Sequence, residues 1–477
     1  MSTHTTGSGP RHFDLAVIGT GSGNSIVDER FADRSVAILE KGVFGGTCLN
    51  VGCIPTKMFV YPADLAHQAA HDHELGVDTA FTGARWREIR DRIFRRIDPI
   101  SVAGRHWRAG SNPNTTLYEG HARFVDVRTL DTGTGEVITA DQVVIAAGSR
   151  PVVPPIEGLD TVPFHTSDTV MRIDELPRRA LIIGGGFVAA EFAHVFSSFG
   201  TTVTVVNRSG ALLREEDRDV SARFTELAQQ QWDVRLDTQV LRVKEYDGGV
   251  HAELDDGSTL DVDLLLVATG RVSNSDGLDL DRTGVAVDDH GLVVVDEHQR
   301  TTAEGIWALG DVSNRYQLKH VSNHEARVVQ HNLLHPDDLV RVNHDHVPSA
   351  VFSHPQVASV GLTEQQARDL GVDHVTARQS YGDTAYGWAM EDTSSFAKVL
   401  ADPVTGRLLG AHILGPQASN LIQPLVQAMA LGSTADQVAR DQYWIHPALM
   451  EVVENVLLGL PLRRRDTTPP VRTSTPG

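Results

Sequence analysis

The sequence of 477 residues predicts an α/β protein with two parallel-sheet domains and a smaller α+β domain at the C-terminus. Two observations predict the parallel sheets: a strand, a glycine-rich turn, a helical stretch and a second strand occur in that order at 13–40 and again at 179–208. A third observation predicts the last domain, because from about residue 346 short strands alternate with turn signals such as "PVTG". The length agrees, since a chain of this size exceeds one hydrophobic core.

The first repeat begins with the strand "FDLAVI" and continues into a turn that contains Gly19, Gly21 and Gly23. The following "SIVDERFA" is compatible with a helix, and "SVAILE" is compatible with a second strand that ends at Glu40. In Rossmann-like units, which bind dinucleotides, a carboxylate at that place accepts a hydrogen bond from a ribose hydroxyl. Asn24 occupies the last position of the GxGxxG pattern, so we expect this helix to pack slightly further from its strand.

The second repeat is "RALIIGGGFVAAEFAHVFSSFG", in which a strand leads into Gly184 and Gly186 and then into a helix that Gly200 can terminate. The next strand is "TTVTVVNR". One such match is weak evidence because glycine-rich turns are common. Two complete Rossmann-like units in one chain predict two bound dinucleotides.

Three later strands stop at glycine and are predicted to return to the nucleotide-binding sheets: "VVIAAGSRP", "LLLVATGRV" and "GIWALGDV". In "ALGD" the glycine permits close approach of the backbone, and Asp311 can accept a hydrogen bond from a ligand hydroxyl. Taken alone, this glycine-aspartate pair is better interpreted as an ordinary turn.

The chain has two cysteines, Cys48 and Cys53, and both lie in "GGTCLNVGCIPTK" at 45–57. Two buried inert thiols are the plain alternative, but confinement to one glycine-rich segment favours a redox-active pair. Because the segment closely follows Glu40, the fold carries both sulfurs alongside the reactive end of the first dinucleotide. A nicotinamide cannot reduce a remote disulfide directly whereas a flavin can, so we expect FAD in the first unit and a nicotinamide in the second.

The letters "CIPTK" predict a helix that begins at Cys53, and a helix N-terminus stabilises a thiolate. We therefore expect Cys53 to be the stabilised thiolate, and Cys48, which we expect to be more exposed, to attack a substrate disulfide. An acid must then protonate the departing thiolate. The segment "YWIHPALMEVVEN" offers His446, with Glu451 placed to hold its other ring nitrogen, although a given member of 22 histidines is more often structural.

A net charge of −20 argues against nucleic acids and anionic membranes as partners, because both require a basic surface. No apolar run is long enough to span a bilayer, and the start "MSTHTTGSGPRH" lacks the apolar region of a signal peptide, so we expect a cytoplasmic protein. Only five of the 42 basic residues are lysines, which is typical of a GC-rich genome. We predict no metal site.

These residues together resemble a known family. The segment "GGTCLNVGCIPTK", the paired nucleotide motifs, "ATGR", "GD" and "HPxxxE" are similar to those of the pyridine nucleotide-disulfide oxidoreductases of the glutathione reductase and lipoamide dehydrogenase type, over about 13 to 460. The resemblance implies a homodimer whose active site is shared between chains. It implies an FAD-binding domain with the redox disulfide at 12–155, a nicotinamide-binding domain at 156–274, a central segment returning to FAD at 275–345 and an interface domain at 346–465. The polar ends, of which the second is also Pro-rich, predict disordered tails at 1–11 and 466–477.

The resemblance also implies roles for individual residues. Cys53 would face the flavin, Cys48 would be the interchange thiol, and Lys57 would pair with Glu191 near the flavin. His446 and Glu451 would come from the partner subunit. The further cofactor-binding positions that the resemblance implies are Lys41, Gly46, Thr47, Ala122, Gly148, Gly270 and Arg271.

The choice of nicotinamide follows from the end of the second repeat. In the family, NAD-specific members have a glutamate there that repels a 2′-phosphate, whereas this chain has Asn207. Arg208 and Arg214 follow, and two guanidinium groups at that separation match a clamp for the phosphate. We therefore predict that the domain at 156–274 binds NADPH.

The substrate prediction rests on the resemblance as well. Glutathione-type members hold a substrate carboxylate with an arginine where this chain has Glu29, although Arg327 falls at another carboxylate-binding position. Four segments are closest to members that reduce mycothione, the disulfide of the sugar-based thiol mycothiol. They are "GTGSGNSI", "HTSDTVMRI", "YGDTAYGWAMEDTS" and "QYWIHPALMEVVENVLLG".

Other activities are less compatible with these residues. A lipoamide dehydrogenase is the nearest alternative, but it would use NAD, which the missing glutamate disfavours. Mercuric reductases and high-molecular-weight thioredoxin reductases need a further cysteine pair, which a total of two cysteines excludes. A flavin-bound sensor or interaction protein without catalysis is compatible with the fold, but it has no need of both cysteines and His446.

Overall fold

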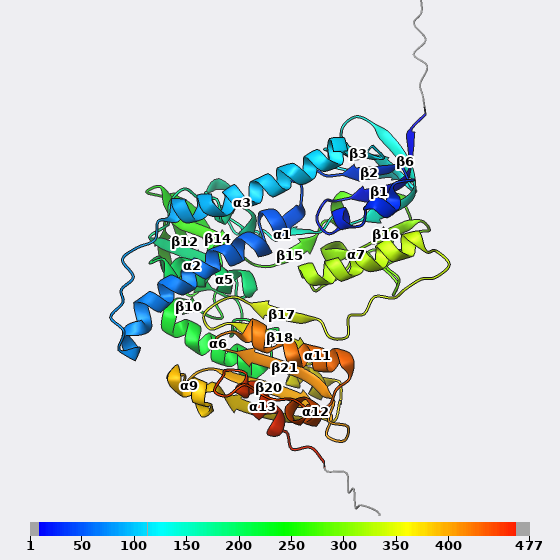
Figure 1. Ribbon diagram of the computed structural model, residues 1–477. Helices are drawn as coiled ribbons and strands as arrows, with labels where there is room; N and C mark the ends of the chain where they lie inside the picture. The colour runs from blue at the N-terminus through cyan, green and yellow to red at the C-terminus, as the bar shows by residue number, and fades with distance from the viewer. Residues whose placement is uncertain (1–8, 112, 464–477) are drawn as a thin grey trace, which may run out of the picture. The chain divides into compact units, whose positions relative to one another are not determined.

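The computed structural model describes residues 9–111 and 113–463, which form two compact units (Figure 1). The predicted tail at 466–477 lies outside the described residues, as does the predicted tail at 1–11 apart from 9–11, where Arg11 already begins a strand. As far as they are described, the first unit comprises Met1–His71, Thr79–Gly210 and Trp232–His344, and the second comprises Asp72–Asp78, Ala211–Gln231 and Asp345–Gly477.

A seven-stranded sheet organises the first part of the first unit, in the order β3-β2-β1-β6-β5-β4 with β16 beside β6. The strands β1, β2, β3, β6 and β16 are parallel, and their apolar side chains are buried among the core residues. The segments "VVIAAGSRP" and "GIWALGDV" thus return to this sheet, as predicted. The strands are β1 (Arg11–Ile18), β2 (Val36–Leu39), β3 (Thr115–Tyr118), β4 (Arg123–Asp126), β5 (Thr129–Asp131), β6 (Val137–Ile145) and β16 (Ile306–Ala308).

The helix predicted over "SIVDERFA" is absent, and this prediction was wrong. Two short 3-10 helices, η1 (Gly23–Ser25) and η2 (Glu29–Phe31), take its place. Side chains from distant segments bind the carbonyl oxygens that a helix would pair internally. Arg108 donates to the carbonyls of Asn24 and Val27 at 2.6 and 2.7 Å, and Gln330 donates to that of Ile26 at 2.6 Å.

A second parallel sheet, in the order β10-β9-β8-β14, is built from the second repeat and from "LLLVATGRV", as predicted. Its repeat consists of β8 (Arg179–Ile183), α5 (Phe187–Ser198) and β9 (Thr202–Val206). The other strands of this part are β7 (Ser149–Pro151), β10 (Asp233–Arg235), β11 (Val240–Tyr246), β12 (Gly249–Leu254), β13 (Thr259–Val262), β14 (Leu264–Val267) and β15 (Arg271–Ser273).

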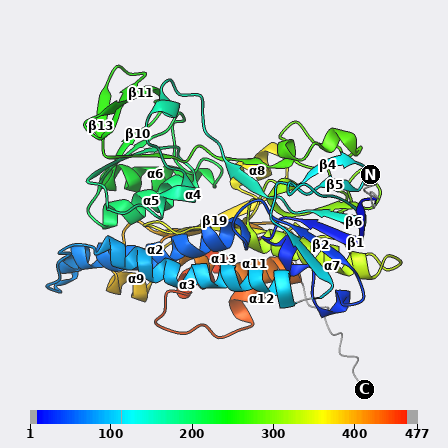
Figure 2. The same cartoon turned by 90° about the horizontal axis from the view of Figure 1, so that it is seen from above.

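Two long helices of the first unit, α2 (Cys53–His71) and α3 (Trp86–His106), run side by side (Figure 2). Phe59 of α2 stacks on Trp86 of α3 with 4.9 Å between the ring centres, so aromatic packing holds the pair together. The short α1 (Gly46–Asn50) precedes α2, which begins at Cys53 as predicted. The remaining α-helices of this unit are α4 (Ser167–Val170) and α7 (Lys319–Leu334).

The second unit is an α+β domain around a five-stranded antiparallel sheet, in the order β17-β18-β21-β20-β19. The turn "PVTG" joins β20 to β21, as predicted. The helix α6 (Arg218–Gln231) also belongs to this unit, although it lies within the range predicted as the nicotinamide domain. Lys398 of β20 binds the start of this helix, because its ammonium donates to Asp217 and Asp219 at 2.8 and 2.7 Å. The other elements are β17 (Pro348–Val351), β18 (Val357–Gly361), β19 (Val375–Ser380), β20 (Phe396–Ala401), β21 (Leu408–Leu414), α8 (Glu364–Asp369), α9 (Ala385–Ala389), α10 (Ala418–Leu421), α11 (Gln423–Leu431), α12 (Ala435–Arg440) and α13 (Glu451–Leu458). Among the described helices of the chain, none is long and apolar enough to cross a bilayer.

Candidate active site

The two cysteines face each other across a tight turn between α1 and α2. Both are free thiols, and their side chains are joined by a hydrogen bond. Gly52 makes the turn possible, because a Cβ there would lie 2.9 Å from the carbonyl oxygen of Thr47. Cys53 is exposed and Cys48 is only partly so, which reverses the expected order of exposure. The cause is local: Cys48 lies within α1, whereas Cys53 is the first residue of α2.

The two thiols have different pKa values. The hydrogen bond from Cys48 and the positive charge of Lys57 lower the pKa of Cys53 from 9.0 to about 7, while partial desolvation of the sulfur and the negative charge of Glu191 oppose them. The same hydrogen bond, together with burial, raises the pKa of Cys48, and the positive charge of Lys319 opposes that rise. Above pH 7 the dithiol therefore holds a thiolate on Cys53 and a proton on Cys48.

An ion pair between α2 and α5 lies next to this dithiol. Lys57 follows Cys53 by one helical turn, and its ammonium donates to both carboxylate oxygens of Glu191 at 2.5 and 2.7 Å. The Glu191 side chain is 5% exposed, so the charge of Lys57 is held with little freedom. The structure thus brings together four residues that the sequence analysis predicted as catalytic, namely Cys48, Cys53, Lys57 and Glu191.

The glycine turns of the two repeats are built in the same way. Gly19 has φ +103°, and a Cβ there would lie 2.3 Å from the carbonyl oxygen of Ala146. Gly184 has φ +130°, and a Cβ there would lie 2.2 Å from the carbonyl oxygen of Ala268. Each turn therefore passes directly over the end of a neighbouring strand, β6 or β14, which only glycine permits. Nothing lies within 4 Å of a Cβ built on Gly186, so the second turn is open to a ligand.

The first turn is tied to the end of β2. Glu40 accepts hydrogen bonds from the backbone and hydroxyl of Thr20, at 2.9 and 2.5 Å, and from the backbone of Gly42 at 2.8 Å. A cavity of about 180 Å³ beside Glu40 is also lined by Phe44 and Arg105. Gly21 and Gly46 touch, since a Cβ on Gly46 would lie 2.7 Å from the Cα of Gly21. Of the other predicted contacts in this region, Lys41 and Thr47 are exposed and Ala122 is buried.

The three returning strands end in one hydrogen-bonded network. Asp311 accepts from the Ser149 hydroxyl at 2.7 Å, and Arg271 donates to that hydroxyl and to the Ser149 carbonyl, both at 2.9 Å. Gly148 and Gly270 flank the network with positive φ, and a Cβ on either would meet nothing within 4 Å. A carboxylate and an open glycine backbone are the donors and acceptors that a nucleotide cofactor requires, so these residues fit FAD.

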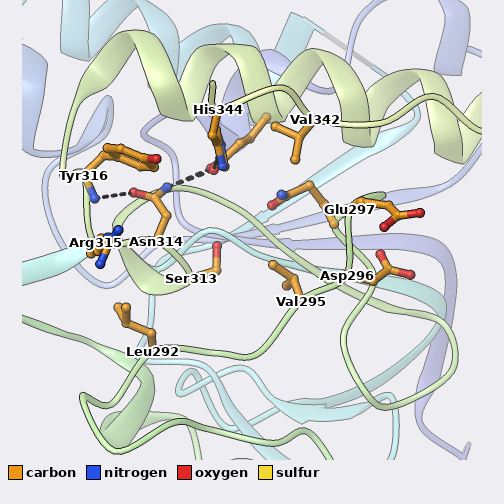
Figure 3. A pocket seen from close by; sticks show the side chains of 12 residues that line it. Leu292, Val295, Asp296, Glu297, Ser313, Asn314, Arg315, Tyr316, Val342 and His344 are labelled. Atoms are coloured by element: carbon orange, nitrogen blue, oxygen red, sulfur yellow. Dashed lines mark hydrogen bonds and ion pairs between the residues drawn. The ribbon is translucent and has the colours of Figure 1, made fainter. Parts of the chain in front are cut away.

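Sequence reasoning missed the residue that fixes the Asp311 turn. Glu325 of α7 is fully buried and accepts from the backbone of Gly310 at 2.6 Å and from the side chain of Asn314. Figure 3 shows Asn314 and its neighbours Tyr316 and His344 around a cavity of about 370 Å³ beside this turn. No local pattern marks Glu325 in the sequence, because its partners are backbone and loop groups.

The predicted acid lies in the second unit. The Nδ1 of His446 and a carboxylate oxygen of Glu451 are 2.7 Å apart, and the other oxygen accepts from the backbone of Ala448 at 3.2 Å. The hydrogen bond from His446 holds the pKa of Glu451 below its usual range. The His446 side chain is 71% exposed, and the apolar side chains of Tyr443 and Ile445 beside it are also exposed. Glu451 thus orients an exposed imidazole.

The residues predicted to select NADPH belong to different units. Arg208 directly follows β9 in the first unit, and Arg214 lies before α6 in the second; both are exposed. Asn207 is buried, and a Cβ on Gly185 would lie 2.6 Å from its side chain, so this asparagine also has a packing role. Glu29 and Arg327, at the positions that the family resemblance relates to substrate carboxylates, are exposed residues of the first unit.

Comparison with known proteins identifies the family. The family model for pyridine nucleotide-disulphide oxidoreductases matches residues 13–326, and the model for the dimerisation domain of the same family matches 347–457. The chain belongs to the pyridine nucleotide-disulphide oxidoreductases. This confirms the predicted family, the fold class and the prediction of an oxidoreductase.

Individual relatives agree with this assignment. A mycothione reductase of Mycobacterium tuberculosis (strain ATCC 25618 / H37Rv) is 56% identical over 94% of this chain and 99% of its own. A glutathione reductase of Burkholderia cepacia is 34% identical over 92% of this chain and 97% of its own. Among solved structures, the HOCl-induced flavoprotein disulfide reductase RclA from Escherichia coli matches with a TM-score of 0.82 and 30% identity, over 93% of this chain and 99% of its own.

Proposed function

We propose that this chain is an NADPH-dependent flavoprotein that reduces mycothione to two molecules of mycothiol through the Cys48 and Cys53 pair. The observation that carries the proposal is the hydrogen-bonded dithiol beside the Lys57–Glu191 ion pair. The 56% identity to a mycothione reductase over nearly the whole chain supports the choice of substrate. The dithiol requires a reducing compartment, and we place the enzyme in the cytoplasm, where it would maintain the thiol redox balance.

The cofactors are FAD and NADPH. Gly19, Gly21, Gly23, Glu40 and Asp311 would hold FAD, with Lys41, Gly46, Thr47, Ala122, Gly148, Gly270 and Arg271 contributing around them. Gly184, Gly186, Arg208 and Arg214 would hold NADPH. When bound, the flavin passes a pair of electrons from the nicotinamide to sulfur.

The chain's own residues carry the disulfide exchange. Cys48 attacks one sulfur of mycothione, forming a mixed disulfide and breaking the substrate's S–S bond. His446 of the partner subunit removes the Cys48 proton and gives it to the departing mycothiol, while Glu451 of the partner subunit holds that imidazole. The Cys53 thiolate then attacks the sulfur of Cys48 and releases the second mycothiol as a thiolate, which takes a proton from water through the same imidazole. The protein is left as the Cys48–Cys53 disulfide, which is the oxidised product.

The test is a comparison of disulfides with one enzyme preparation. Oxidation of NADPH by the purified protein is followed with mycothione, glutathione disulfide and lipoamide as alternative substrates. We expect the highest kcat/KM with mycothione, and a higher kcat/KM for NADPH than for NADH. A preference for lipoamide with NADH would indicate a dihydrolipoamide dehydrogenase, and absence of turnover with every disulfide would indicate a flavin-bound sensor instead.

A further inference from the structure

One lysine contacts the first glycine turn from a distant part of the chain. Lys319 is the first residue of α7, and its ammonium donates to the Ser22 hydroxyl at 2.8 Å. Ser22 lies between Gly21 and Gly23, is 8% exposed, and donates to Asn323 of α7 at 3.2 Å. Two side chains on successive turns of α7 therefore fix the hydroxyl, and the hydroxyl fixes the ammonium at the turn.

The first glycine turn lacks the long helix that an ordinary Rossmann unit has at this place. In such a unit the N-terminus of the following helix presents free N–H groups and a partial positive charge to the pyrophosphate. Here the three-residue η1 replaces that helix. The buried guanidinium of Arg108 binds the carbonyls of Asn24 and Val27, beyond the glycines. A dianionic pyrophosphate at this turn needs a cation from elsewhere.

Lys319 differs from most other lysines of the chain in its partners. Lys57, Lys244 and Lys398 each form ion pairs with carboxylates. Within residues 9–111 and 113–463, Lys319 is half-buried and forms no ion pair with a carboxylate. A half-buried ammonium with a hydroxyl as its partner retains donors for an anionic ligand.

We propose that Lys319 is a cofactor-binding residue that supplies the positive charge for the pyrophosphate of FAD at the turn formed by residues 19–23. The inference rests on the proposed function, in which the first unit binds FAD. Because Lys319 also opposes the rise in the pKa of Cys48, its charge reaches from the glycine turn to the dithiol. The remaining four lysines include a matched control, since Lys244 is an exposed residue of β11.

The experiment measures FAD binding by the purified holoenzyme and its variants. Flavin fluorescence after ultrafiltration gives the FAD dissociation constant of the wild type, Lys319→Met, Lys319→Arg and Lys244→Met at several salt concentrations. We expect Lys319→Met to weaken FAD binding by about tenfold or more, which is the scale of a charge-assisted hydrogen bond. We expect a smaller loss with Lys319→Arg and none with Lys244→Met. The salt dependence of FAD binding should also be shallower in Lys319→Met, because one screened charge is gone.

Each result has one interpretation. Equal FAD dissociation constants for Lys319→Met and Lys244→Met would overturn the inference. If Lys319→Met does not fold, Lys319→Gln repeats the test, because its amide can still form a hydrogen bond with Ser22 but carries no charge. Wild-type affinity for FAD in Lys319→Gln would equally overturn the inference. Failure of the wild type and of Lys244→Met to bind FAD would instead contradict the proposed function.

Discussion

The pKa of the Cys53 thiol is set by three neighbours, two that lower it and one that raises it. The Cys48 hydrogen bond and Lys57 lower its pKa to about 7, and Glu191 raises it. Since this pKa lies below the ordinary thiol value of 9.0, the thiolate is present above pH 7 and is lost as the pH falls through 7. The Cys48 hydrogen bond is the largest of these effects, and the Lys57–Glu191 pair adjusts the pH at which the second step of the disulfide exchange slows.

Single substitutions in this ion pair should move the Cys53 pKa in opposite directions. Lys57→Met removes the positive charge and should raise the pKa by about one unit, whereas Glu191→Gln leaves Lys57 in place and should lower it. The pKa is measured from the pH dependence of alkylation of the reduced holoenzyme by iodoacetamide, with Lys244→Met as a control that should not change it. Shifts in the same direction for Lys57→Met and Glu191→Gln would refute the assigned roles.

The roles of the two cysteines can be distinguished by measuring each half of the reaction separately. Cys48→Ser retains a hydroxyl that can donate to Cys53 but removes the attacking sulfur, so turnover of mycothione should fall to background. Reduction of the flavin by NADPH should remain within about twofold of the wild type, because it does not involve Cys48. Anaerobic stopped-flow absorbance measures flavin reduction directly. Loss of flavin reduction in this variant would contradict the assignment of Cys48 as the interchange thiol.

Among the elements, the strands could be predicted from local patterns and the first helix could not. The strand at 13–18 and the strands that return at "VVIAAGSRP" and "GIWALGDV" are short apolar runs that end at glycine, and each is found in the predicted sheet. The segment "SIVDERFA" has helical spacing, but Arg108 and Gln330 take its carbonyls from 81 and 304 residues away. Competition from distant side chains leaves no local signal.

In the candidate site, too, contacts between residues distant in the sequence could not be predicted from local patterns. The pairing of Lys57 with Glu191 came from the family resemblance, because 134 residues separate them in the sequence. The ion pair is now seen directly, but Ser149 and Glu325, which fix Asp311 and its turn, were missed. Exposure was also wrong for the cysteines, since the extent of α1 around Cys48 is set by packing that a motif does not describe.

The loop that replaces the first helix should depend on Arg108. Burial lowers the pKa of this guanidinium to about 10, and it donates to Asn24 and Val27. Arg108→Met leaves those carbonyls without their donor, so we expect the apparent free energy of unfolding to fall by about 2–3 kcal/mol. Arg95→Met, at an exposed position of α3, should change it by less than about 0.5 kcal/mol. Urea denaturation followed by circular dichroism measures both, and equal midpoints would show that Arg108 is not needed by the loop.

At the scale of the whole molecule, the second unit carries the family's dimerisation domain and the His446–Glu451 pair. His446 is exposed, and so are the nearby apolar side chains of Tyr443 and Ile445. Apolar groups around a polar centre are typical of a surface that a second protein chain covers. In the proposed homodimer this surface presents the imidazole to the dithiol of the other chain.

An active site shared between two subunits predicts that two inactive variants regain activity when they form a heterodimer. Cys48→Ser and His446→Gln each disable both sites of a homodimer, the second by about a hundredfold or more through loss of the general acid. A heterodimer with one chain of each kind has one site that lacks both groups and one that is intact, so its activity should be about half that of the wild type. Co-expression with two affinity tags isolates this heterodimer, and the two homodimers purified in the same way are the controls. If Cys48 and His446 act within one chain, each site of the heterodimer lacks one group, and its activity stays at the level of the two variant homodimers. That result would place the acid in the same subunit as the dithiol.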